Sequence, residues 1–598
     1  MKKMILLFVL LLSVSVFADD RSDIEENVKY LASPELKGRK PGTDGIEKAA
    51  AFIEKKFKDI GLKGINNTYT QSFEVKTGKK LGAGENNLSF KVTIPRPGVP
   101  ADRWPTTEKK WEINTDYLPY SFSGSGSAEA EMVFCGFGIS APELKYDDYE
   151  GVDVKGKVVI LLSDSPDGDS KTGDFAKYSN FRYKLSNAKK QNAAAIIFVN
   201  IQGDSANVFQ KLDQVDRMSS DAGIIAVQAN RVQIDKFFPN SDKLFPSEET
   251  IYKTKKPKSF AIPKAVCKIS VSLEDEVTTT KNVFGLLKGD SDKYIVIGAH
   301  YDHLGEGHTH GSRYKGGTDK IHYGADDNAS GTSAIIQLAK RFEDEEIEDN
   351  ILFVAFSAEE MGLLGSKAFV KNLPIDKSKI KFYVNYDMVG RLEDKDLQVF
   401  GVGTSPKFES TLDNIATEKA ITIKKIATGN GPSDHQSFNI EKVPVLFFFS
   451  GIHSEYHTPQ DTPDKVDYDG MIKIIDYSEA VIRTLSKESK LEYSEVKESE
   501  KKATISRTSS SVVMGVIPSY SDTEHGFVLD GVKSGGPAEI GGLKAGDIII
   551  AVDDDEVKDI YDFMYSYWTK NPGDVVKVKV LRGGKTEPLV FNVKLAAK

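Results

Sequence analysis

Short apolar runs alternate with segments of helical spacing through residues 279–485 of this 598-residue chain. The apolar runs lie at residues 294–299, 351–356, 381–386 and 443–449. Runs this short, bounded by polar turns, are typical of strands buried in a parallel sheet. Helical spacing is clearest at residues 333–342 and 468–485. The alternation predicts an α/β domain in which helices cover a central sheet.

The N-terminal residues carry two further patterns. Residues 1–18 combine a basic start, a short apolar core and small residues before Asp19, as in a secretory signal peptide. This core is too short to cross a bilayer, and we expect no membrane insertion after cleavage. Helical spacing then runs through residues 23–61 and stops at Gly61. We expect an exported protein, periplasmic or extracellular, in which residues 19–115 begin the main domain.

The pattern changes between residues 116 and 276. Strand-like apolar runs lie at residues 130–138, 157–162 and 195–199, with a helical segment at 183–192. We interpret this stretch as a mainly-β domain inserted into the α/β domain, which resumes at residues 277–488. The two cysteines, Cys135 and Cys267, both fall in predicted strands of the insertion, and their spacing leaves open whether they form a disulfide.

A second change of pattern follows the predicted helix at 468–485. Residues 489–511 are charged and Ser-rich, which is typical of a linker. Residues 512–598 alternate short apolar runs with Gly-containing turns and predict a separate small domain.

Composition narrows the classes of function. The net charge is -9, and the lysines and arginines are scattered without a basic stripe, which opposes binding to nucleic acid or to an anionic membrane. Eight of the nine histidines lie between His300 and His457, within one third of the chain. The candidate chemistry therefore lies in the α/β domain.

Residues able to bind metal ions follow the predicted strands of that domain: His300, Asp326, Asp327, Asp387 and His457. The crevice beyond the carboxyl ends of parallel strands is where open α/β sheets bind ligands. Imidazoles mixed with carboxylates suit a borderline cation such as zinc, and two histidines with three carboxylates suffice for two ions that share an aspartate. Asp302 lies two residues after His300, so its carboxylate can hold the second imidazole nitrogen and fix the tautomer.

A pair of glutamates, Glu359 and Glu360, follows the apolar run at 351–356 and opens a segment of helical pattern. Adjacent side chains point in different directions, so one glutamate can bind a cation while the other accepts a proton from an attacking water. The simpler interpretation is that two acidic residues favour the positive end of a helix dipole. The pair alone does not separate these interpretations.

These motifs resemble, in the same order, the catalytic domain of the di-zinc aminopeptidase family that includes bacterial leucyl aminopeptidase, aminopeptidase Y and glutamate carboxypeptidase II. The resemblance covers roughly residues 23–61 and 279–485, including the helical entry at 31–39. It implies a three-layer α/β/α domain with a mixed central sheet and two Zn²⁺ ions as cofactors. The implied metal ligands are His300, Asp327, Glu360, Asp387 and His457. The resemblance also implies Glu359 as the general base and Tyr456 as a donor to the oxyanion. The choice of Asp327 over Asp326 rests on the family pattern.

Two further resemblances concern the other domains. Residues 136–139 and 154–159 resemble a protease-associated (PA) domain, which this family inserts within the peptidase and which implies a restriction of the cleft. Residues 542–552 and the Gly-rich turns before them resemble a PDZ domain of bacterial envelope proteases. That resemblance implies that the backbone around Gly515 receives the terminal carboxylate of a peptide.

The expected function is that of an exported zinc-dependent exopeptidase, an aminopeptidase that acts on peptide substrates. Three alternatives remain open at this level. A carboxypeptidase or dipeptidase of the same fold would need cationic groups near the cleft, which the sequence does not locate. Glutaminyl cyclase uses one metal ion, and the presence of His300 and Asp387 argues against it. A non-catalytic peptide-binding protein is opposed by the presence of every ligand and of Glu359.

Overall fold

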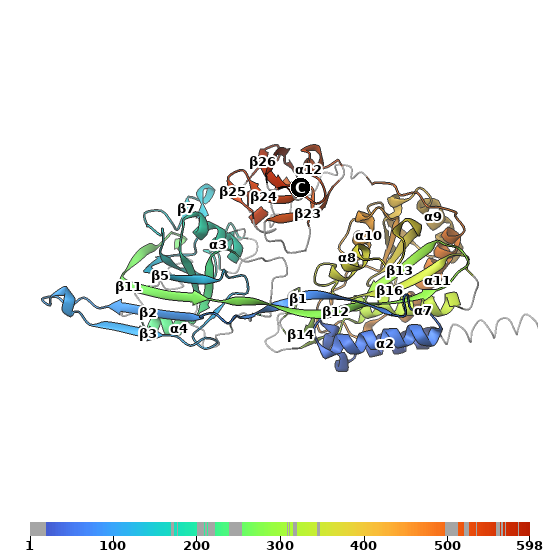
Figure 1. Ribbon diagram of the computed structural model, residues 1–598, viewed down its shortest axis with the longest axis horizontal. Helices are drawn as coiled ribbons and strands as arrows, with labels where there is room; N and C mark the ends of the chain where they lie inside the picture. The colour runs from blue at the N-terminus through green and yellow to red at the C-terminus, as the bar shows by residue number, and fades with distance from the viewer. Residues whose placement is uncertain are drawn as a thin grey trace, which may run out of the picture. The chain divides into compact units, whose positions relative to one another are not determined.

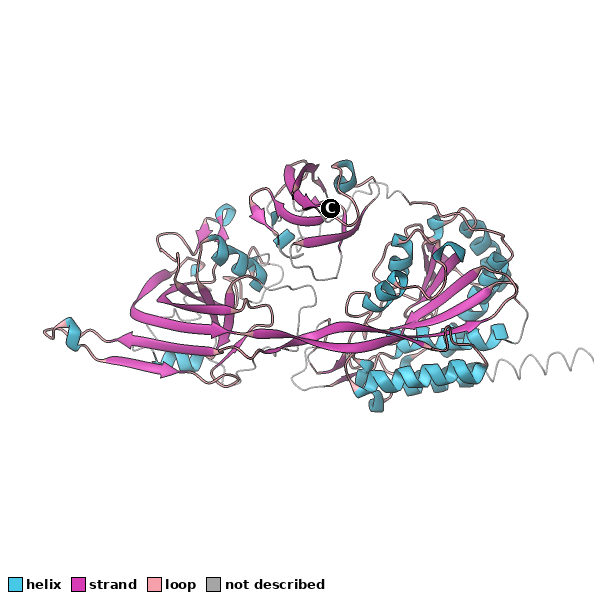
Figure 2. Cartoon of the chain, in the orientation of Figure 1, coloured by secondary structure: helices cyan, strands magenta, loops and turns pink. Residues whose placement is uncertain are grey.

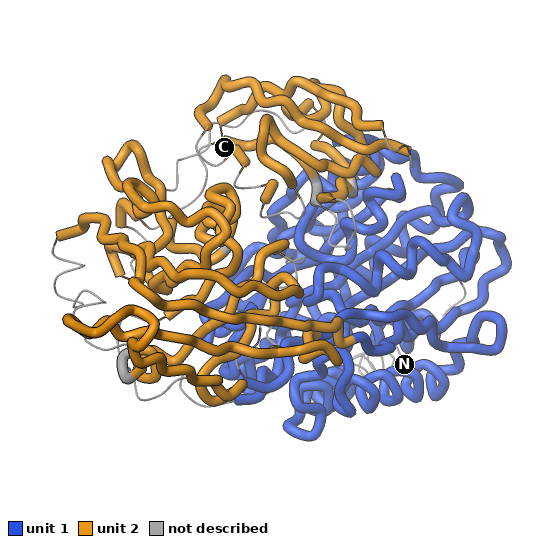
Figure 3. Tube along the Cα trace, turned by 60° about the vertical axis from the view of Figure 1, so that its left-hand side comes forward, with its two compact units in different colours: residues 1–77, 277–498 blue, residues 78–276, 499–598 orange. Residues whose placement is uncertain are grey.

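The computed structural model of the chain divides into two compact units, which are described separately (Figures 1 and 3). The first comprises residues 1–77 and 277–498, and the second comprises residues 78–276 and 499–598. The structure describes residues 20–168, 173–175, 178–199, 209, 212, 222–237, 254–307, 309, 311–314, 320–343, 347–496, 512–518, 526–533, 535–557, 562–563, 566–567, 570–583, 585 and 587–597. The expected signal peptide at 1–18 lies outside these residues. Within them, no helix is long and apolar enough to cross a membrane.

An eight-stranded mixed sheet forms the centre of the first unit (Figure 2). In spatial order its strands are β1 (Thr70–Leu81), β12 (Leu273–Leu287), β16 (Asn350–Phe356), β13 (Tyr294–His300), β17 (Ile380–Tyr386), β20 (Val445–Phe449), β18 (Leu397–Phe400) and β19 (Ile423–Ile426). The central strands β16, β13, β17 and β20 are parallel, whereas β12 runs antiparallel to β16 and β18 runs antiparallel to β20. The predicted α/β fold with a mixed sheet is confirmed.

Helices cover both faces of this sheet because its central strands are apolar at successive positions. On β13, Ile295 and Ile297 pack into one core and Val296 packs into another. The first core also contains residues of α2 (Asp44–Ile60), α7 (Gly331–Glu343), α9 (Phe408–Lys419) and α11 (Tyr468–Ser486). The second contains residues of α8 (Leu364–Lys371) and α10 (His435–Ile440). The result is a three-layer α/β/α arrangement.

The N-terminal segment of the chain is part of the first unit. Residues 20–31 are helical, a 3₁₀ segment η1 (Pro34–Arg39) follows, and α2 ends at Gly61, which adopts φ 100°. Glycine favours this left-handed conformation, so the predicted stop at Gly61 has a direct physical cause. Asp20 accepts hydrogen bonds from Gln337 Nε2 (2.6 Å) and Arg341 Nη2 (2.6 Å), which join the segment to α7.

The second unit contains another eight-stranded sheet. Its strands in spatial order are β3 (Thr106–Lys110), β2 (Asn87–Thr93), β11 (Ser259–Val271), β5 (Gly126–Cys135), β8 (Val158–Leu162), β9 (Ala195–Val199), β10 (Ile225–Ala229) and β4 (Tyr117–Pro119). Separate apolar clusters cover its two faces, and its helices are α3 (Phe181–Lys190) and α4 (Arg231–Phe237). The predicted mainly-β insertion therefore has its own core.

The insertion begins earlier in the chain than the expected boundary at residue 116. Strand β2 pairs antiparallel with β11, and β3 pairs with β2, so residues 87–110 extend the sheet of the insertion. The physical reason is a pairing between strands distant in sequence, Phe90 opposite Cys267, which local periodicity does not reveal. The chain crosses between the units within β1 and β12.

The C-terminal segment forms a small sheet of its own. Its strands are β22 (Val516–Pro518), β23 (Phe527–Val532), β24 (Ile548–Val552), β26 (Val575–Leu581), β27 (Leu589–Lys594) and β25 (Asp555–Glu556), with the short helix α12 (Pro537–Ile540). These elements enclose a separate apolar core. The observation agrees with the predicted separate domain.

The expected linker at 489–511 starts too early. Leu491 packs into the core of the first unit, and the Ser494 N–H donates to the Thr404 carbonyl at 2.8 Å. Residues 497–511 lie outside the described residues. Residues 489–496 therefore belong to the first unit.

Both cysteines are free and buried. They lie on neighbouring antiparallel strands, but Cys135 is paired with Ser259 and Cys267 with Ala130. This register separates the two thiols along the strands, and the structure contains no bridge between them.

Candidate metal centre

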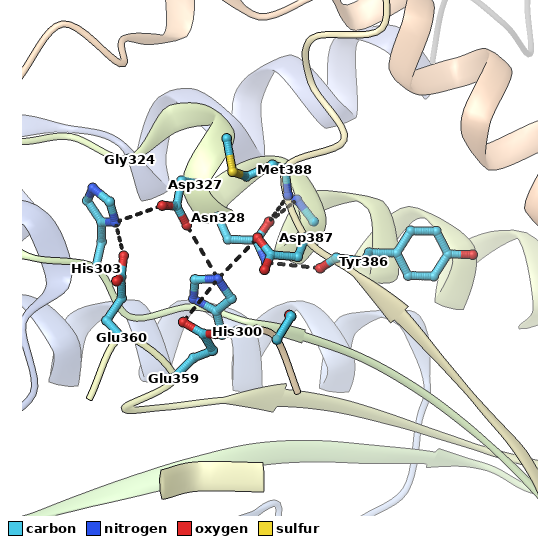
Figure 4. Close-up of polar contacts among 12 residues, drawn as sticks. His300, His303, Gly324, Asp327, Asn328, Glu359, Glu360, Tyr386, Asp387 and Met388 are labelled. Carbon is cyan, nitrogen blue, oxygen red and sulfur yellow. Dashed lines mark hydrogen bonds and ion pairs between the residues drawn. The ribbon is translucent and has the colours of Figure 1, made fainter. Parts of the chain in front are cut away.

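The candidate site forms at one edge of the first unit's sheet, where its parallel strands end. His300 is the last residue of β13, Asp387 follows β17, and His457 lies in the loop after β20. Strands β13, β16, β17 and β20 are parallel neighbours, so their carboxyl ends come to the same edge. Figure 4 shows the resulting cluster of histidines and carboxylates. The topology brings together residues that are far apart in sequence.

His300 faces three carboxylates. Its Nε2 atom lies 3.3 Å from Asp387 Oδ1, 3.4 Å from Asp327 Oδ1 and 3.9 Å from Glu359 Oε2. Atoms of His300, Asp327 and Asp387 form one group of potential metal ligands within 4.8 Å of one another. These are three of the five expected ligands.

A second group lies on the other side of Asp327. His457 Nε2 is 3.2 Å from Asp327 Oδ2 and 3.2 Å from Glu360 Oε2. His303 Nδ1 is 2.8 Å from Glu360 Oε1 and 3.8 Å from Asp327 Oδ2. The expected ligands Glu360 and His457 are therefore adjacent, and His303 joins them although it was not among the predicted ligands. The sequence signal that could have indicated His303 is its position three residues after His300, just beyond the end of β13.

The two neighbouring aspartates of the turn face different groups. Asp327 directs Oδ1 to His300 and Oδ2 to His457, whereas Asp326 Oδ1 accepts hydrogen bonds from the Gly390 N–H (2.6 Å) and the Ser330 hydroxyl (3.0 Å). The second Asp326 oxygen lies 3.3 Å from His453 Nε2. Only Asp327 lies between the two groups of ligands. The assignment of Asp327 as the shared ligand stays a prediction, and this geometry favours it.

The turn that carries Asp327 is held from two sides. The Asp461 carboxylate accepts hydrogen bonds from the backbone N–H groups of Asp326 (3.0 Å) and Asp327 (3.1 Å). Asn328 Nδ2 donates to the Tyr386 carbonyl (2.9 Å), next to Asp387. The turn is therefore fixed both to the loop after His457 and to the end of β17.

Asp302 has a different partner from the one expected. Its Oδ1 atom accepts a hydrogen bond from the Glu359 N–H at 3.0 Å, and its Oδ2 atom accepts one from the Glu360 N–H at 3.3 Å. The nearest acceptor to His300 Nδ1 is the Asp302 carbonyl oxygen (3.2 Å), while Asp302 Oδ1 is 3.7 Å away. The carboxylate orients the glutamate turn, and the backbone carbonyl orients the imidazole.

The two glutamates lie in a turn before the helix that follows β16. Helix α8 begins only at Leu364, and Ala358, Gly362 and Leu363 have φ of 58°, 96° and 62°. The expectation that the glutamate pair opens the helix is thus wrong, because these left-handed residues interrupt the helical geometry before Leu364. Attraction to the dipole of α8 does not account for this pair, since neither residue is in its first turn.

Tyr456 stacks on the ring of His457, with centroids 3.8 Å apart and an interplanar angle of 24°. Burial raises the pKa of Tyr456 above its ordinary value, and the carboxylates of Asp327 and Glu360 add to this shift. The hydroxyl therefore stays protonated and is available as a hydrogen-bond donor at neutral pH. Its expected role at an oxyanion stays a prediction.

The charges of the site fit cation binding. Burial raises the pKa of Glu359 and of Asp387, because a buried carboxylate loses its hydration. Both oxygens of the nearby buried Asp434 lack a hydrogen-bond partner among the described residues. An excess of buried carboxylates is costly without positive charge, and the mixed nitrogen and oxygen donors suit zinc. The residues present therefore fit a metal ion in each of the two groups.

The remaining histidines separate into different environments. His322 is buried, and its Nε2 accepts a hydrogen bond from the Ser312 hydroxyl at 2.7 Å. His435 stacks on Phe447 with centroids 4.5 Å apart, and burial lowers its pKa to about 3. His308 and His310 lie outside the described residues. Neither His322 nor His435 belongs to the two groups of ligands.

In the C-terminal domain, Gly515 has φ 78°, and its carbonyl accepts a hydrogen bond from the Lys533 N–H at 2.8 Å. The neighbouring Met514 carbonyl accepts one from the Ala538 N–H at 2.8 Å. The turn at 514–515 is thus held by backbone hydrogen bonds and lies before β22. Binding of a peptide carboxylate there stays a prediction.

Comparisons with known proteins find two families along the chain. Residues 282–482 match peptidase family M28, and residues 512–595 match the PDZ domain. Aminopeptidase YwaD of Bacillus subtilis (strain 168) is 25% identical over 436 residues, which cover 70% of this chain and 81% of that protein. Leupeptin-inactivating enzyme 1 of Streptomyces exfoliatus is 30% identical over 166 residues, 27% of this chain and 34% of the relative, so the chain spans about a third of that enzyme. The solved aminopeptidase from Aneurinibacillus sp. strain AM-1 has 22% identity and a TM-score of 0.47, over 80% of this chain and 96% of its own.

Proposed function

We propose, from the premise that this chain belongs to peptidase family M28 through residues 282–482 and carries a PDZ domain at 512–595, that it is a zinc-dependent aminopeptidase. The relatives named aminopeptidase support the reaction class. The observation that carries the proposal is Asp327, whose two carboxylate oxygens face His300 and His457, each beside a further carboxylate. This is the donor set that two zinc ions sharing one aspartate require.

The proposed ligands form two sets that share Asp327. His300 and Asp387 would hold one ion with Asp327, and Glu360 and His457 would hold the other. Bound zinc supplies a Lewis acid that polarises the scissile carbonyl and lowers the pKa of water to about 7. The remaining roles in the mechanism belong to side chains of the protein.

Glu359 is the proposed general base. It is largely buried at the edge of the site, and its Oε2 atom lies 3.9 Å from His300 Nε2, a longer separation than those between His300 and the ligands Asp327 and Asp387. The raised pKa of Glu359 suits a group that takes a proton from the attacking water and later gives it to the leaving amine. Tyr456 is the proposed donor to the oxygen that develops negative charge. Asp302 keeps the Glu359 turn in place through its two accepted hydrogen bonds.

Two buried arginines near the site are already engaged within the fold and are not free to bind a substrate carboxylate. Recognition of a substrate carboxylate needs an available cation, and two arginines interact electrostatically with the site residues. Arg39 donates to backbone carbonyls, and Arg391 lies 3.3 Å from Asp461 and 3.8 Å from Glu455. Both guanidinium groups already have partners inside the fold.

The roles of the other parts extend this proposal. The N-terminal pattern at residues 1–18 supports export to the periplasm or the extracellular space. The inserted sheet supports a PA-type domain, and the PDZ domain supports binding of a peptide C-terminus near Gly515.

A zinc measurement combined with a substrate panel tests the function. The panel comprises matched peptides with a free amine, a blocked amine and a blocked carboxyl group. We expect zinc in the purified protein, hydrolysis that requires the free amine and indifference to the blocked carboxyl. Hydrolysis that instead requires the free carboxyl would favour a carboxypeptidase, and pyroglutamate formation from N-terminal glutamine would favour a cyclase. Absence of turnover on every peptide would favour a binding protein.

A further inference from the structure

Arg39 brings a buried positive charge to the metal centre from a part of the chain outside the matched residues 282–482. Its side chain is fully buried, with 0% exposure. Nε donates to the Tyr301 carbonyl at 2.8 Å, Nη2 to the Gly324 carbonyl at 2.9 Å, and Nη1 to the Tyr323 carbonyl at 2.9 Å and to the Leu31 carbonyl. Every nitrogen of the guanidinium therefore has a backbone acceptor.

The acceptors belong to the two loops that carry the proposed ligands. Tyr301 lies between His300 and Asp302 at the end of β13, and Gly324 begins the turn that contains Asp327. The guanidinium is planar and presents its donors in a fixed fork, so it sets the distance between the two carbonyls that it binds. One side chain thus spans the separation between the first ligand and the shared aspartate.

The backbone that carries Arg39 is shaped for this position. Lys37, Gly38 and Arg39 have φ of 47°, 70° and 49°, three left-handed residues in succession. A Cβ atom at Gly38 would lie 2.5 Å from the His322 carbonyl oxygen and 2.8 Å from the Gly305 carbonyl oxygen. The turn is therefore packed directly against the loop after β13. Non-glycine residues with positive φ persist only when their surroundings determine them strongly.

Arg39 also contacts the loop after β13 through its backbone, and its positive charge lies near several carboxylates. The His303 N–H donates to the Arg39 carbonyl at 3.3 Å, so the backbone of Arg39 also binds the loop after β13. The guanidinium interacts electrostatically with Asp302, Asp327, Glu360 and Asp461. A neutral side chain of similar length would remove both the fork of donors and the compensating charge.

We propose that Arg39 is a positioning residue of the metal centre, which holds the His300 strand end and the Asp327 turn at the separation that two-site metal binding requires. Through Arg39, the N-terminal segment therefore contributes to the geometry of the metal centre. This inference rests on the proposed function for the identity of the metal, and it does not depend on which peptide is cleaved.

The matched control is Arg341, a second arginine with little exposure in the same unit. Arg341 Nη1 lies 2.7 Å from Asp476, and Nη2 lies 2.6 Å from Asp20, on the helical layer and away from the ligand loops. Its replacement should reduce thermal stability without moving the metal ligands. The comparison of Arg39 with Arg341 therefore separates positioning from general stability.

The experiment measures zinc affinity by chelator competition, and thermal unfolding without metal, for the full chain and for Arg39→Met, Arg39→Lys and Arg341→Met. We expect Arg39→Met to lower zinc affinity about 10- to 100-fold, the usual range for residues that orient metal ligands. Arg39→Lys, which keeps the charge but loses the fork, should fold and show a smaller loss of affinity. Arg341→Met should lower the unfolding temperature with zinc affinity within about 2-fold of the parent, since its ion pairs contact no ligand loop.

Wild-type zinc affinity in both folded Arg39 variants would overturn the proposal, as would an equal loss of affinity in Arg341→Met. If Arg39→Met fails to fold, Arg39→Lys decides the question alone. Failure of the aminopeptidase proposal has a different signature, since the substrate panel would then show no turnover that requires a free amine while the zinc affinities of the variants still differ.

Discussion

The carboxylate of Asp302 accepts a hydrogen bond from the backbone N–H of Glu359 at 3.0 Å. The second oxygen binds the N–H of Glu360, so one buried side chain fixes the turn that presents both glutamates. The direction of each glutamate side chain follows from this turn. Asp302 therefore orients the glutamate turn from outside the two groups of potential ligands.

Replacement of Asp302 by asparagine should reduce turnover. The amide keeps one acceptor oxygen but presents an N–H₂ group toward one of the two backbone N–H groups, which disturbs the turn. We expect turnover to fall about 10- to 100-fold, the usual range for residues that orient metal ligands. Steady-state kinetics with zinc analysis measures the change. The control is Asp376→Asn, which replaces an exposed aspartate that caps the 3₁₀ segment η6 (Lys377–Lys379). Unchanged turnover in Asp302→Asn would show that the turn holds its shape without this carboxylate.

The second unit should show a pH dependence that originates in Asp148. This buried carboxylate accepts hydrogen bonds from the Phe137 and Ile139 N–H groups, both at 3.0 Å, and from the Tyr146 hydroxyl at 2.9 Å. Burial raises its pKa to about 7. A carboxyl whose folded pKa lies above its unfolded value gives stability that is present at low pH and is lost as pH rises through the folded pKa.

Asp148→Asn tests this origin because asparagine preserves the shape of the side chain and removes its titration. The parent should lose stability relative to the variant between about pH 4 and 7, the interval between the unfolded and folded pKa values. Urea unfolding followed by tryptophan fluorescence reports on the inserted domain through Trp104 and Trp111, while the third tryptophan, Trp568, lies in the C-terminal domain and is replaced by phenylalanine in both proteins. A difference in stability between the two proteins that stays constant across this interval would place the titration elsewhere.

Removal of the PDZ domain should leave a folded aminopeptidase. The cut belongs after residue 496, because Leu491 and Ser494 pack against the first unit. A chain that ends at 496 should be active on a small aminoacyl substrate, since the proposed site uses residues of the first unit alone. A chain that ends at 490 should be less stable, because it loses the buried Leu491 side chain. A soluble but inactive 1–496 chain would make the PDZ domain part of the active assembly.

The sequence predicts best those elements whose signal is local. The run of apolar residues at 195–199 is strand β9 at the predicted bounds, and α11 extends over the predicted 468–485 with one further residue. Each is specified by its own periodicity, and burial in the sheet or against it reinforces the same choice. The expected ligands also lie close together, because parallel strands bring their carboxyl ends to one edge of the sheet independently of the loop conformations.

The elements that the sequence misses depend on distant partners. Helix α8 begins only at Leu364, after the left-handed residues Gly362 and Leu363, and the turn before it binds Asp302, which is far away in sequence. Strands β2 and β3 extend the inserted sheet only through pairing with β11. In the sequence, Arg39 lies in a charged segment that is typical of a protein surface. Its four carbonyl acceptors come together only when the chain folds.

The central claim is that Glu359 acts as the general base while Glu360 binds metal, and the measurement that tests it most directly is zinc content together with turnover in Glu359→Gln and Glu360→Gln. Glu359→Gln should keep two zinc ions per chain and lose about 10²- to 10⁴-fold in turnover, because the attacking water then has no group to accept its proton. Glu360→Gln should lose zinc, because a neutral amide replaces an anionic ligand. Loss of zinc from Glu359→Gln with two ions kept in Glu360→Gln would reverse the two roles, and full activity in both variants would contradict the account.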